Sequence, residues 1–300
     1  MSTKTICLSK EEQFALKEKF KDAKVCKTPP YAQFQLKVEG CTITAYTSGK
    51  VVFQGNDADF YADGYTYVTK SKKKKEHPAP TQAEIYPQCG SDEVGTGDYF
   101  GPVTVCATCV TQEDCDFLRE LEIQDSKAIT DERIRELGPQ LTKRLTYSLL
   151  VLNNEKYNAI HPNYNMVAIK SRLHNQAFVH LQRKLQGLPK FCIIDQFVQA
   201  KSYYRYLNNV NDVVYDIHFE TKAENKYLSV AAGSIIARYA FLLAFDKMCE
   251  QYDFDFPKGA GSKVDQAIAL FVKRYGEEEL RKVAKLHFAN TKKALHKTME

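Results

Sequence analysis

Four carboxylates stand where a strand or a helix is expected to begin or end, and such positions let side chains gather around a ligand. Asp92 and Glu93 are adjacent within an apolar strand flanked by glycines. Asp195 directly follows the apolar run 191–194, and Glu224 precedes a long apolar helical stretch. A carboxylate at the end of an apolar strand is poorly solvated unless positive charge compensates it. Carboxylate oxygens are hard ligands, and they select Mg²⁺ or Mn²⁺.

Several carboxylates around divalent cations suit phosphodiester hydrolysis, because two cations about 4 Å apart can activate a water and stabilise the leaving oxyanion. Each acid taken singly has a more ordinary explanation: a helix dipole stabilises Glu224, and Asp195 caps a turn. Asp92 and Glu93 are the least ordinary pair. Since adjacent strand residues point to opposite faces, both reach one pocket only if the strand bulges or Glu93 lies at its rim.

A glycine-rich loop follows these two acids, with the sequence Gly-Thr-Gly-Asp-Tyr-Phe-Gly-Pro at 95–102. Glycines let a backbone approach a ligand closely, so that amides can reach phosphate or ribose. A dinucleotide-binding loop would need a helix directly after its glycines. Here Pro102 leads into Val103 and Val105, which are typical of a strand. The pattern therefore excludes a nicotinamide site.

The larger part of the chain alternates between strand and helix patterns. Apolar runs predict strands at 86–94, 102–110, 147–152, 191–195 and 213–219. Helical spacing predicts helices at 130–145, at 165–185, after Glu224, after Ser262 and near Glu277. Strands interleaved with helices indicate a mixed α/β sheet. Cys106 and Cys109 have the spacing of a zinc pair, but residues three apart in a strand point to opposite faces, so we assign them to packing.

The N-terminal part predicts a small α+β domain. Ser9 and Glu12 form a capping-box pattern before a helix, which ends before the prolines at 29–30. Alternating segments at 34–38, 42–46 and 51–53 are separated by turn residues and predict an antiparallel meander. One helix can cover only one face of such a sheet, so the other face is free to meet a partner.

A run of lysines and prolines at 70–80 separates the two parts, because like charges repel and proline resists helix and sheet. We therefore predict an N-terminal substrate-binding domain at 1–75, a linker at 76–83 and a catalytic domain at 84–300. Residues 1–75 hold fourteen Lys and eight Asp or Glu, a net charge of +6 that leaves −1 for the remaining 225 residues. This asymmetry suggests a polyanionic partner.

Composition bounds the class of protein. With 44% hydrophobic and 26% charged residues, the chain is typical of globular proteins. Nine cysteines without a framework spacing suggest reduced thiols. No apolar run approaches the ~20 residues of a membrane span, and the N-terminus lacks a signal-peptide pattern. We expect a cytoplasmic monomer that does not bind membranes, and we interpret His174 and His180 as ordinary helix residues.

At residues 90–102 the sequence resembles the opening motif of the bacterial type 2 ribonucleases H, and specifically of ribonuclease HIII. Further stretches are similar to later motifs of that family, in the family's order: 125–127 (Asp-Ser-Lys), 194–197, 222–224, 230–238 and 256–261. The similarity extends from residue 84 to about residue 290. Gly233 departs from the family, in which alanine is common; a glycine inside a helix costs roughly 1 kcal/mol.

Two features favour the HIII branch over its sister HII. The fourth acid is Glu224, where the HII branch usually has Asp, and the N-terminal helix and meander resemble the TATA-binding-protein-like domain of HIII enzymes. The resemblance implies a ribonuclease H-like mixed sheet flanked by helices, preceded by that small α+β domain.

The resemblance also implies an activity: endonucleolytic cleavage of the RNA strand of RNA–DNA hybrids, leaving 5′-phosphate and 3′-hydroxyl ends. Mg²⁺ or Mn²⁺ would be the cofactor. The implied catalytic and metal-binding residues are Asp92, Glu93, Asp195 and Glu224, with Asp92 bridging the cations. The implied substrate-binding residues are Gly95, Thr96, Gly97, Ser126 and Lys127, the glycine loop meeting ribose 2′-hydroxyls.

Two alternatives remain open at this point. One is incision at single embedded ribonucleotides, as in the HII branch; Glu224 and the N-terminal unit argue against it. The other is a hybrid-binding protein without turnover, acting through the basic N-terminal unit. Binding alone would gain nothing from four acids near phosphates, which argues against this second alternative.

Overall fold

The computed structural model describes residues 2–58, 60–62, 84–123 and 129–297 of the chain. The chain divides into two compact units, Met1–Pro78 and Ala79–Glu300. Each unit has a sheet and a hydrophobic core of its own. The predicted linker at 76–83, like the lysine run before it, lies outside the described residues.

The N-terminal unit is a five-stranded antiparallel sheet with one helix. Its elements are β1 (Ser2–Cys7), α1 (Lys10–Lys19), β2 (Lys24–Val25), β3 (Ala32–Val38), β4 (Cys41–Tyr46) and β5 (Lys50–Gly55), with strand order β1-β5-β4-β3-β2. The predicted capping box and the meander β3-β4-β5 are confirmed. The sequence prediction missed the two edge strands, because β1 is largely polar and β2 has only two residues, so both give little apolar signal.

Alternation along these strands leaves one sheet face open. Residues on one face form the core of this unit together with Leu16 of α1, and they include Phe34, Leu36, Ile43 and Phe53. Most intervening positions carry polar side chains that are half-buried or exposed, namely Gln35, Lys37, Thr42 and Gln54, whereas Thr44 on the same face is buried and Val52 is apolar. The helix covers the apolar face, so the polar face is free to contact another molecule.

The second unit contains a mixed five-stranded sheet, as predicted. Strands β6 (Gln88–Val94), β7 (Val103–Val110) and β8 (Thr146–Leu152) are antiparallel neighbours, and β9 (Phe191–Asp195) and β10 (Ile217–Glu220) run parallel to β6. The strand order is β10-β9-β6-β7-β8. The strand predicted at 213–219 begins only at Ile217. The central strand, β6, is the one that carries Asp92 and Glu93.

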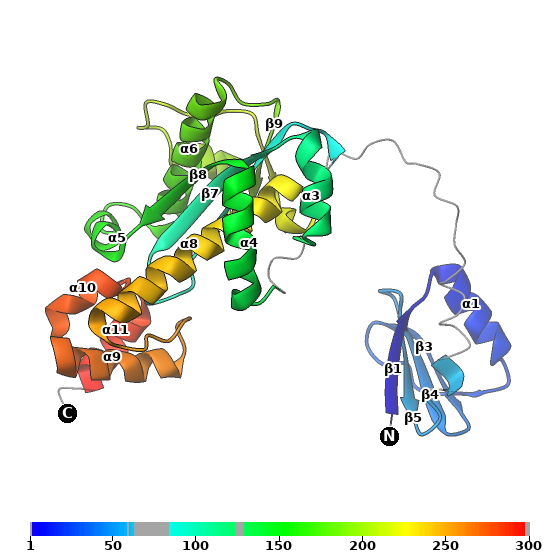
Figure 1. Cartoon of the computed structure of the whole chain (residues 1–300). Coiled ribbons are helices and arrows are strands. Elements are labelled where there is room, and N and C mark those ends of the chain that lie inside the picture. The colour runs from blue at the N-terminus through cyan, green and yellow to red at the C-terminus, as the bar shows by residue number, and fades with distance from the viewer. Residues whose placement is uncertain (1, 59, 63–83, 124–128, 298–300) are drawn as a thin grey trace. The chain divides into compact units, whose positions relative to one another are not determined.

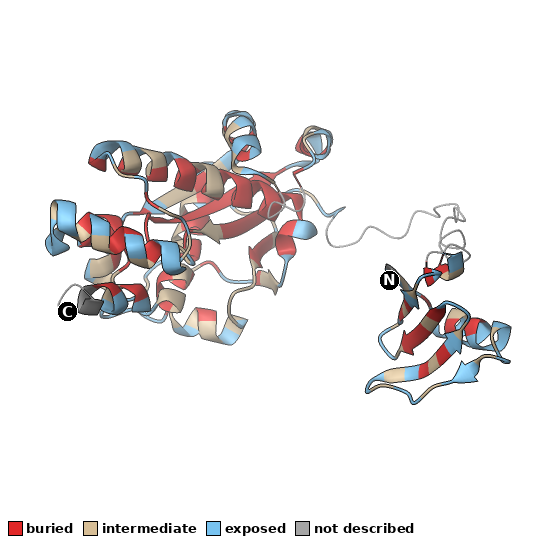
Figure 2. Ribbon diagram, turned by 90° about the horizontal axis from the view of Figure 1, so that it is seen from below, coloured by how far each residue is buried: buried red, intermediate tan, exposed pale blue. Residues whose placement is uncertain are grey.

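Helices cover both faces of this sheet (Figure 1). The long helix α8 (Leu228–Tyr252) packs on β6 and β7, with α4 (Asp131–Arg144) beside it and α3 (Cys115–Glu120) nearby, while α6 (Met166–Leu185) packs on β7 and β8. A Cβ at Gly90 would lie 2.4 Å from the backbone nitrogen of Val230, so glycine lets α8 touch β6 directly. The buried residues follow the sheet between the helices (Figure 2).

Helix α8 corrects one expectation from the sequence. By length and composition, residues Leu228–Tyr252 are apolar enough to cross a membrane, with a mean hydropathy of 1.7 in the most apolar window. The sequence interpretation that no apolar run approaches this length is therefore wrong. Of that window, 78% is buried inside the protein, as in the core helix of a globular domain.

A set of short helices completes the second unit. They are α5 (Asn154–Ile160), α7 (Ala200–Arg205), α9 (Ser262–Tyr275), α10 (Leu280–Val283) and α11 (Ala289–Lys297). The helix predicted after Ser262 is confirmed, and the one near Glu277 is a 3₁₀ turn that continues into α10. An isolated antiparallel bridge between Phe100 and Ala284 joins the end of α10 to the glycine-rich loop. This bridge links the C-terminal helices to the neighbourhood of the acids.

Candidate active site

Asp92 and Asp195 lie side by side at the ends of adjacent parallel strands. Ser91 of β6 pairs with Ile194 of β9, which makes the next residues, Asp92 and Asp195, neighbours. Asp92 is buried with 7% exposure, and hydrogen bonding from Ser234 of α8 shows that it faces that helix. Parallel pairing thus brings together two acids that are about a hundred residues apart in the sequence.

Glu224 reaches the same region on a 3₁₀ turn, η4 (Ala223–Asn225), just before α8. The turn begins with Lys222 in the left-handed conformation (φ 56°), and Asp195 Oδ1 accepts a hydrogen bond from Ala223 N at 2.9 Å. Glu224 itself has 1% exposure. Asp195 therefore fixes the turn that carries Glu224, and these two acids are placed together by one local contact.

Glu93 lies on the opposite face of the sheet. The β6–β7 pairing is continuous from Gln88 to Val94, so no bulge brings Glu93 to the side of Asp92. Glu93 stands near the end of β6, two residues beyond Ser91, where the pairing of β6 with β9 ends. The remaining possibility from the sequence, that Glu93 lies at the rim of the strand, matches this position.

Two residues of α6, Lys170 and His174, fix the Glu93 carboxylate, and Ser91 of β6 contacts His174 in turn. Lys170 forms an ion pair with Glu93 Oε1. His174 Nε2 lies 2.8 Å from Glu93 Oε2, and His174 Nδ1 lies 2.7 Å from the hydroxyl of Ser91. Every group is satisfied when the Ser91 hydroxyl donates to Nδ1 and Nε2–H donates to the carboxylate. Both oxygens of Glu93 thus have cationic or hydrogen-bonding partners.

The carboxyl groups of Asp92 and Glu93 differ in how far nearby positive charge compensates them. Burial, followed by the charge of Glu93, raises the pKa of Asp92 to about 8, and Asp195 adds to this effect. Burial alone would also raise the pKa of Glu93, but His174 and Lys170 lower it overall. Within the described part of the chain, Lys170 and His174 lower the pKa of Glu93, whereas no basic side chain lowers the pKa of Asp92. A divalent cation bound by buried carboxylate oxygens would supply that charge to Asp92, so the donor set fits Mg²⁺ or Mn²⁺.

In the part of the chain that the structure describes, no group of three or more His, Cys, Asp or Glu side chains is arranged to hold a metal ion by itself. Glu93 does not join Asp92 on its face of the sheet, because the Glu93 side chain is bound on the far face by α6. The structure thus brings Asp92, Asp195 and the turn of Glu224 to one strand end, and it places Glu93 at the rim.

His174 and Lys170 are site residues that the sequence interpretation missed. His174 was taken as an ordinary helix residue, which is wrong: it is fully buried and connects Ser91 to Glu93. The available signal was the four-residue separation of Lys170 and His174, which places both on one face of α6. That spacing indicates that the two side chains share a helix face, but it does not show which residues they contact.

The glycine loop begins where β6 ends. Gly95 has φ 92°, and a Cβ there would lie 2.2 Å from the carbonyl oxygen of Pro102, so only glycine fits. Thr96 is half-buried, and Gly97 is exposed with nothing within 4 Å of a Cβ position. Among the described residues, nothing therefore lies close to the tip of the loop. Ser126 and Lys127, the other expected substrate-binding residues, lie outside the described residues.

The late loop that resembled the family, 256–261, packs against the glycine loop. Asp98 Oδ1 accepts a hydrogen bond from Gly259 N at 2.6 Å, and Tyr99 N donates to Gly259 O at 2.8 Å. Arg238 of α8 and Lys258 both pair with Asp131 at the start of α4. Motifs that are distant in the sequence thus support one another around the site.

The Lys170–Glu93 pair gives a first prediction. In metal-free protein we expect Lys170→Met to lower the free energy of unfolding by about 3 kcal/mol, because it leaves a buried carboxylate without its ammonium. Glu93→Gln together with Lys170→Met should cost clearly less than the sum of the single changes. Urea unfolding of wild type, the two single variants and the double variant gives the double-mutant cycle that measures the interaction between the two side chains. Additive single effects would mean that the pair does not stabilise the fold.

Comparison with known proteins covers nearly the whole chain. The family model described as Ribonuclease HII matches residues 89–291, and a model described as a domain of unknown function (DUF3378) matches residues 4–78. The protein named Ribonuclease HIII from Bacillus pumilus is 46% identical over 276 residues, 89% of this chain and 90% of that protein. Ribonuclease HIII from Bacillus subtilis is 42% identical over 304 residues, 98% of this chain and 97% of that protein.

Solved structures agree with the sequence relatives. The crystal structure of Bst-RNase HIII in complex with Mn²⁺ superposes with a TM-score of 0.70 at 35% identity, covering 98% of each chain. The structure of Aquifex aeolicus RNase H3 has a TM-score of 0.56 at 20% identity, covering 94% of this chain and 99% of that one, and supports the fold alone. The chain therefore belongs to the ribonuclease HII family, in its ribonuclease HIII branch, and is an endoribonuclease of the ribonuclease H type.

Proposed function

We propose that this ribonuclease H cuts the RNA strand of RNA–DNA hybrids internally and leaves 5′-phosphate and 3′-hydroxyl ends. The observation that carries the proposal is the pair Asp92 and Asp195, held side by side at two parallel strand ends, with the Asp92 carboxyl short of positive charge. The relatives named ribonuclease HIII support the reaction class.

Asp92, Asp195 and Glu224, joined by Glu93 from the rim of β6, would hold Mg²⁺ or Mn²⁺. Bound cations would activate a water and stabilise the oxygen that leaves the phosphorus. The protein's own contribution is placement. Asp195 fixes the turn of Glu224, and Lys170 and His174 hold Glu93 in one rotamer. The complex of Bst-RNase HIII with Mn²⁺ supports this use of the site.

The glycine loop would read the sugar of the RNA strand. Gly97 is exposed at the tip, with open space around it, so backbone groups of 95–97 can approach a ribose closely. The 2′-hydroxyl can donate and accept hydrogen bonds, and it distinguishes RNA from DNA. Ser126 and Lys127 would lie near backbone phosphates, where Lys127 supplies a point charge.

The N-terminal unit would supply affinity for the hybrid. Its open sheet face carries Gln35, Lys37, Thr42 and Gln54, and residues 1–75 have a net charge of +6. Contacts to phosphates carry affinity but little sequence information. We therefore propose that the protein has low specificity for base sequence. We also propose that it acts as a monomer in the cytoplasm.

A second candidate function is incision at a single ribonucleotide embedded in DNA. The observation that favours it is the match of residues 89–291 to the model described as Ribonuclease HII. A duplex with one embedded ribonucleotide separates the two functions. Poor cutting there, beside efficient cutting of a hybrid with a continuous RNA strand, is the expected result.

The deciding experiment is cleavage of an end-labelled RNA–DNA hybrid in Mg²⁺, in Mn²⁺ and in chelator, with RNA duplex and DNA duplex as controls. We expect metal-dependent cutting of the RNA strand of the hybrid only, and ligation of the downstream product without kinase treatment would identify its 5′-phosphate. Cutting in chelator would refute the metal site. Cutting of the RNA duplex at the same rate would refute hybrid specificity.

A further inference from the structure

A lysine ammonium is buried directly behind the glycine loop. Lys285 has 0% exposure, and its Nζ donates hydrogen bonds to the carbonyl oxygens of Asp98 at 2.7 Å and Gly101 at 2.5 Å. Burial lowers its pKa to about 7, and the charge of Asp98 only partly opposes this effect. Enclosing an ammonium among backbone carbonyls costs free energy unless its hydrogen bonds are needed where they are made.

The two carbonyls belong to the part of the loop that follows Gly95, Thr96 and Gly97. Asp98 N closes a turn back to the carbonyl of Gly95, and Gly101 has φ 84° before the chain enters β7. One ammonium therefore holds both ends of the four-residue segment 98–101. Any movement of this segment would be passed to the exposed tip at Gly97, because the turn joins the two.

The backbone around Lys285 is paired with the same segment. Lys285 N donates to the carbonyl of Tyr99 at 2.9 Å, and Gly101 N donates to the carbonyl of Val283 at 2.9 Å. Together with the bridge between Phe100 and Ala284, these bonds form a short ladder. The lysine thus reaches the loop from a segment that is already in register with it.

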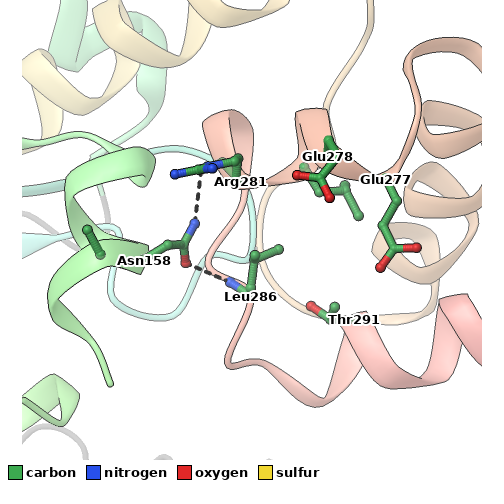
Figure 3. Close-up of a pocket in the computed structure, with 8 residues that line it drawn as sticks. Asn158, Glu277, Glu278, Arg281, Leu286 and Thr291 are labelled. Carbon is green, nitrogen blue, oxygen red and sulfur yellow. Dashed lines mark hydrogen bonds between the residues drawn. The ribbon is translucent and has the colours of Figure 1, made fainter. Parts of the chain in front are cut away.

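Helix α5 fixes this arrangement through two asparagines four residues apart. Asn158 Nδ2 donates to the carbonyl of Arg281 at 3.0 Å, and Leu286 N donates to Asn158 Oδ1 at 3.1 Å (Figure 3). Asn158 Nδ2 also donates to the carbonyl of Ala284 at 2.8 Å. One helical turn earlier, Asn154 Nδ2 donates to the carbonyl of Gly101 at 2.9 Å. Hydrogen bonds from α5 therefore hold both the segment 281–286 and the glycine loop.

We propose that Lys285 is a positioning residue for RNA-strand recognition, whose ammonium holds the carbonyls of Asp98 and Gly101 so that the tip 95–97 meets the ribose 2′-hydroxyl. It touches neither substrate nor metal, and it acts through the loop. The proposal rests on the proposed role of this loop in binding the RNA strand. A methionine would fill the same volume but would leave both carbonyls without this donor.

The test compares full-length wild type with Lys285→Met. Binding is measured in chelator, as the ratio of the dissociation constants for a DNA duplex and for an RNA–DNA hybrid of equal sequence. We expect Lys285→Met to reduce this preference for hybrid about tenfold, because a site built to bind a hydroxyl loses discrimination when it is misplaced. Hydrogen exchange of the amides at 95–101 should become faster. In cleavage, KM should rise more than kcat falls.

The matched control is Lys282→Met. Lys282 lies three residues before Lys285, on α10, is partly exposed and pairs with Glu279. Its substitution by methionine therefore removes the same charge from the same segment of the chain. We expect Lys282→Met to show the same preference for hybrid over DNA duplex, and the same hydrogen-exchange rates at 95–101, as wild type. A folded Lys285→Met protein with an unchanged ratio and unchanged loop exchange would overturn the proposal.

If Lys285→Met does not fold, Asn154→Ala tests the same mechanism, because it removes the other side-chain donor to Gly101. We expect a smaller loss of hybrid preference in the same direction, and no change with this variant would overturn the proposal. A wild-type protein that does not prefer hybrid over DNA duplex would instead refute the proposed function. The two failures are therefore distinguishable.

Discussion

Asp92→Asn is expected to lower kcat for hybrid cleavage by at least about 10³-fold, the loss of roughly 4 kcal/mol of transition-state stabilisation. Asparagine keeps the shape of the side chain but brings no negative charge to a cation. Asp92 is buried beside Asp195 at the strand ends, where its carboxylate is placed to bind a cation. Asp195→Asn should have a similar effect, because it removes the second carboxylate charge at the strand ends, while its side-chain oxygen can still accept the hydrogen bond from Ala223 N.

Two further measurements separate a lost metal ligand from a damaged fold. Addition of Mn²⁺ should raise the melting temperature of wild type but not of Asp92→Asn. Without metal the variant should be at least as stable as wild type, because it removes a buried carboxylate whose ionisation is disfavoured. Hybrid binding in chelator should be retained, since asparagine keeps the shape of a side chain whose ionisation is disfavoured without metal.

The matched control for Asp92→Asn is Asp212→Asn. Asp212 has a side chain that is 64% exposed and pairs with Arg183 on the surface of the same unit. This variant should keep wild-type cleavage and the Mn²⁺-dependent rise in melting temperature. Full cleavage by Asp92→Asn would remove Asp92 from the site. A Mn²⁺ response that persists in this variant would show that the cation binds elsewhere.

Removal of residues 1–75 is expected to raise KM for hybrid by about 10- to 100-fold, with a much smaller change in kcat. The deleted segment carries a net charge of +6, whereas the acids all lie in the second unit, which has its own core. Each lost phosphate contact should also reduce the slope of log affinity against log salt by about 0.9. Cleavage assays at several salt concentrations measure all three quantities.

A single substitution tests whether the open sheet face makes these contacts. Lys37→Glu reverses one charge on β3, on the face away from α1, and should raise KM severalfold. Lys21→Glu makes the same change in the turn after α1 and serves as the control. An unchanged KM in the truncated protein would exclude a docking role for the whole unit. Equal effects of the two substitutions would indicate a general effect of charge rather than a defined face.

Local patterns were sufficient for most of the fold. The capping box at Ser9, the cap of α4 at Thr130 and the apolar run before Asp195 each depend on residues within one turn or one strand, and the structure confirms all three. The polar edge strand β1 was missed because its apolar signal is weak. The 3.6- and 2-residue periods report which face is buried and carry no information on what lies against it.

The sequence by itself thus determined which acids stand at strand and helix ends, and where the glycine loop begins. Only the tertiary structure decided that Asp92 and Glu93 face opposite sides of the sheet without a bulge, and that Lys170 and His174 hold the latter. It likewise placed Lys285 behind a loop 187 residues earlier. The physical reason is that such contacts depend on strand pairing and helix packing between distant segments, which no local spacing encodes.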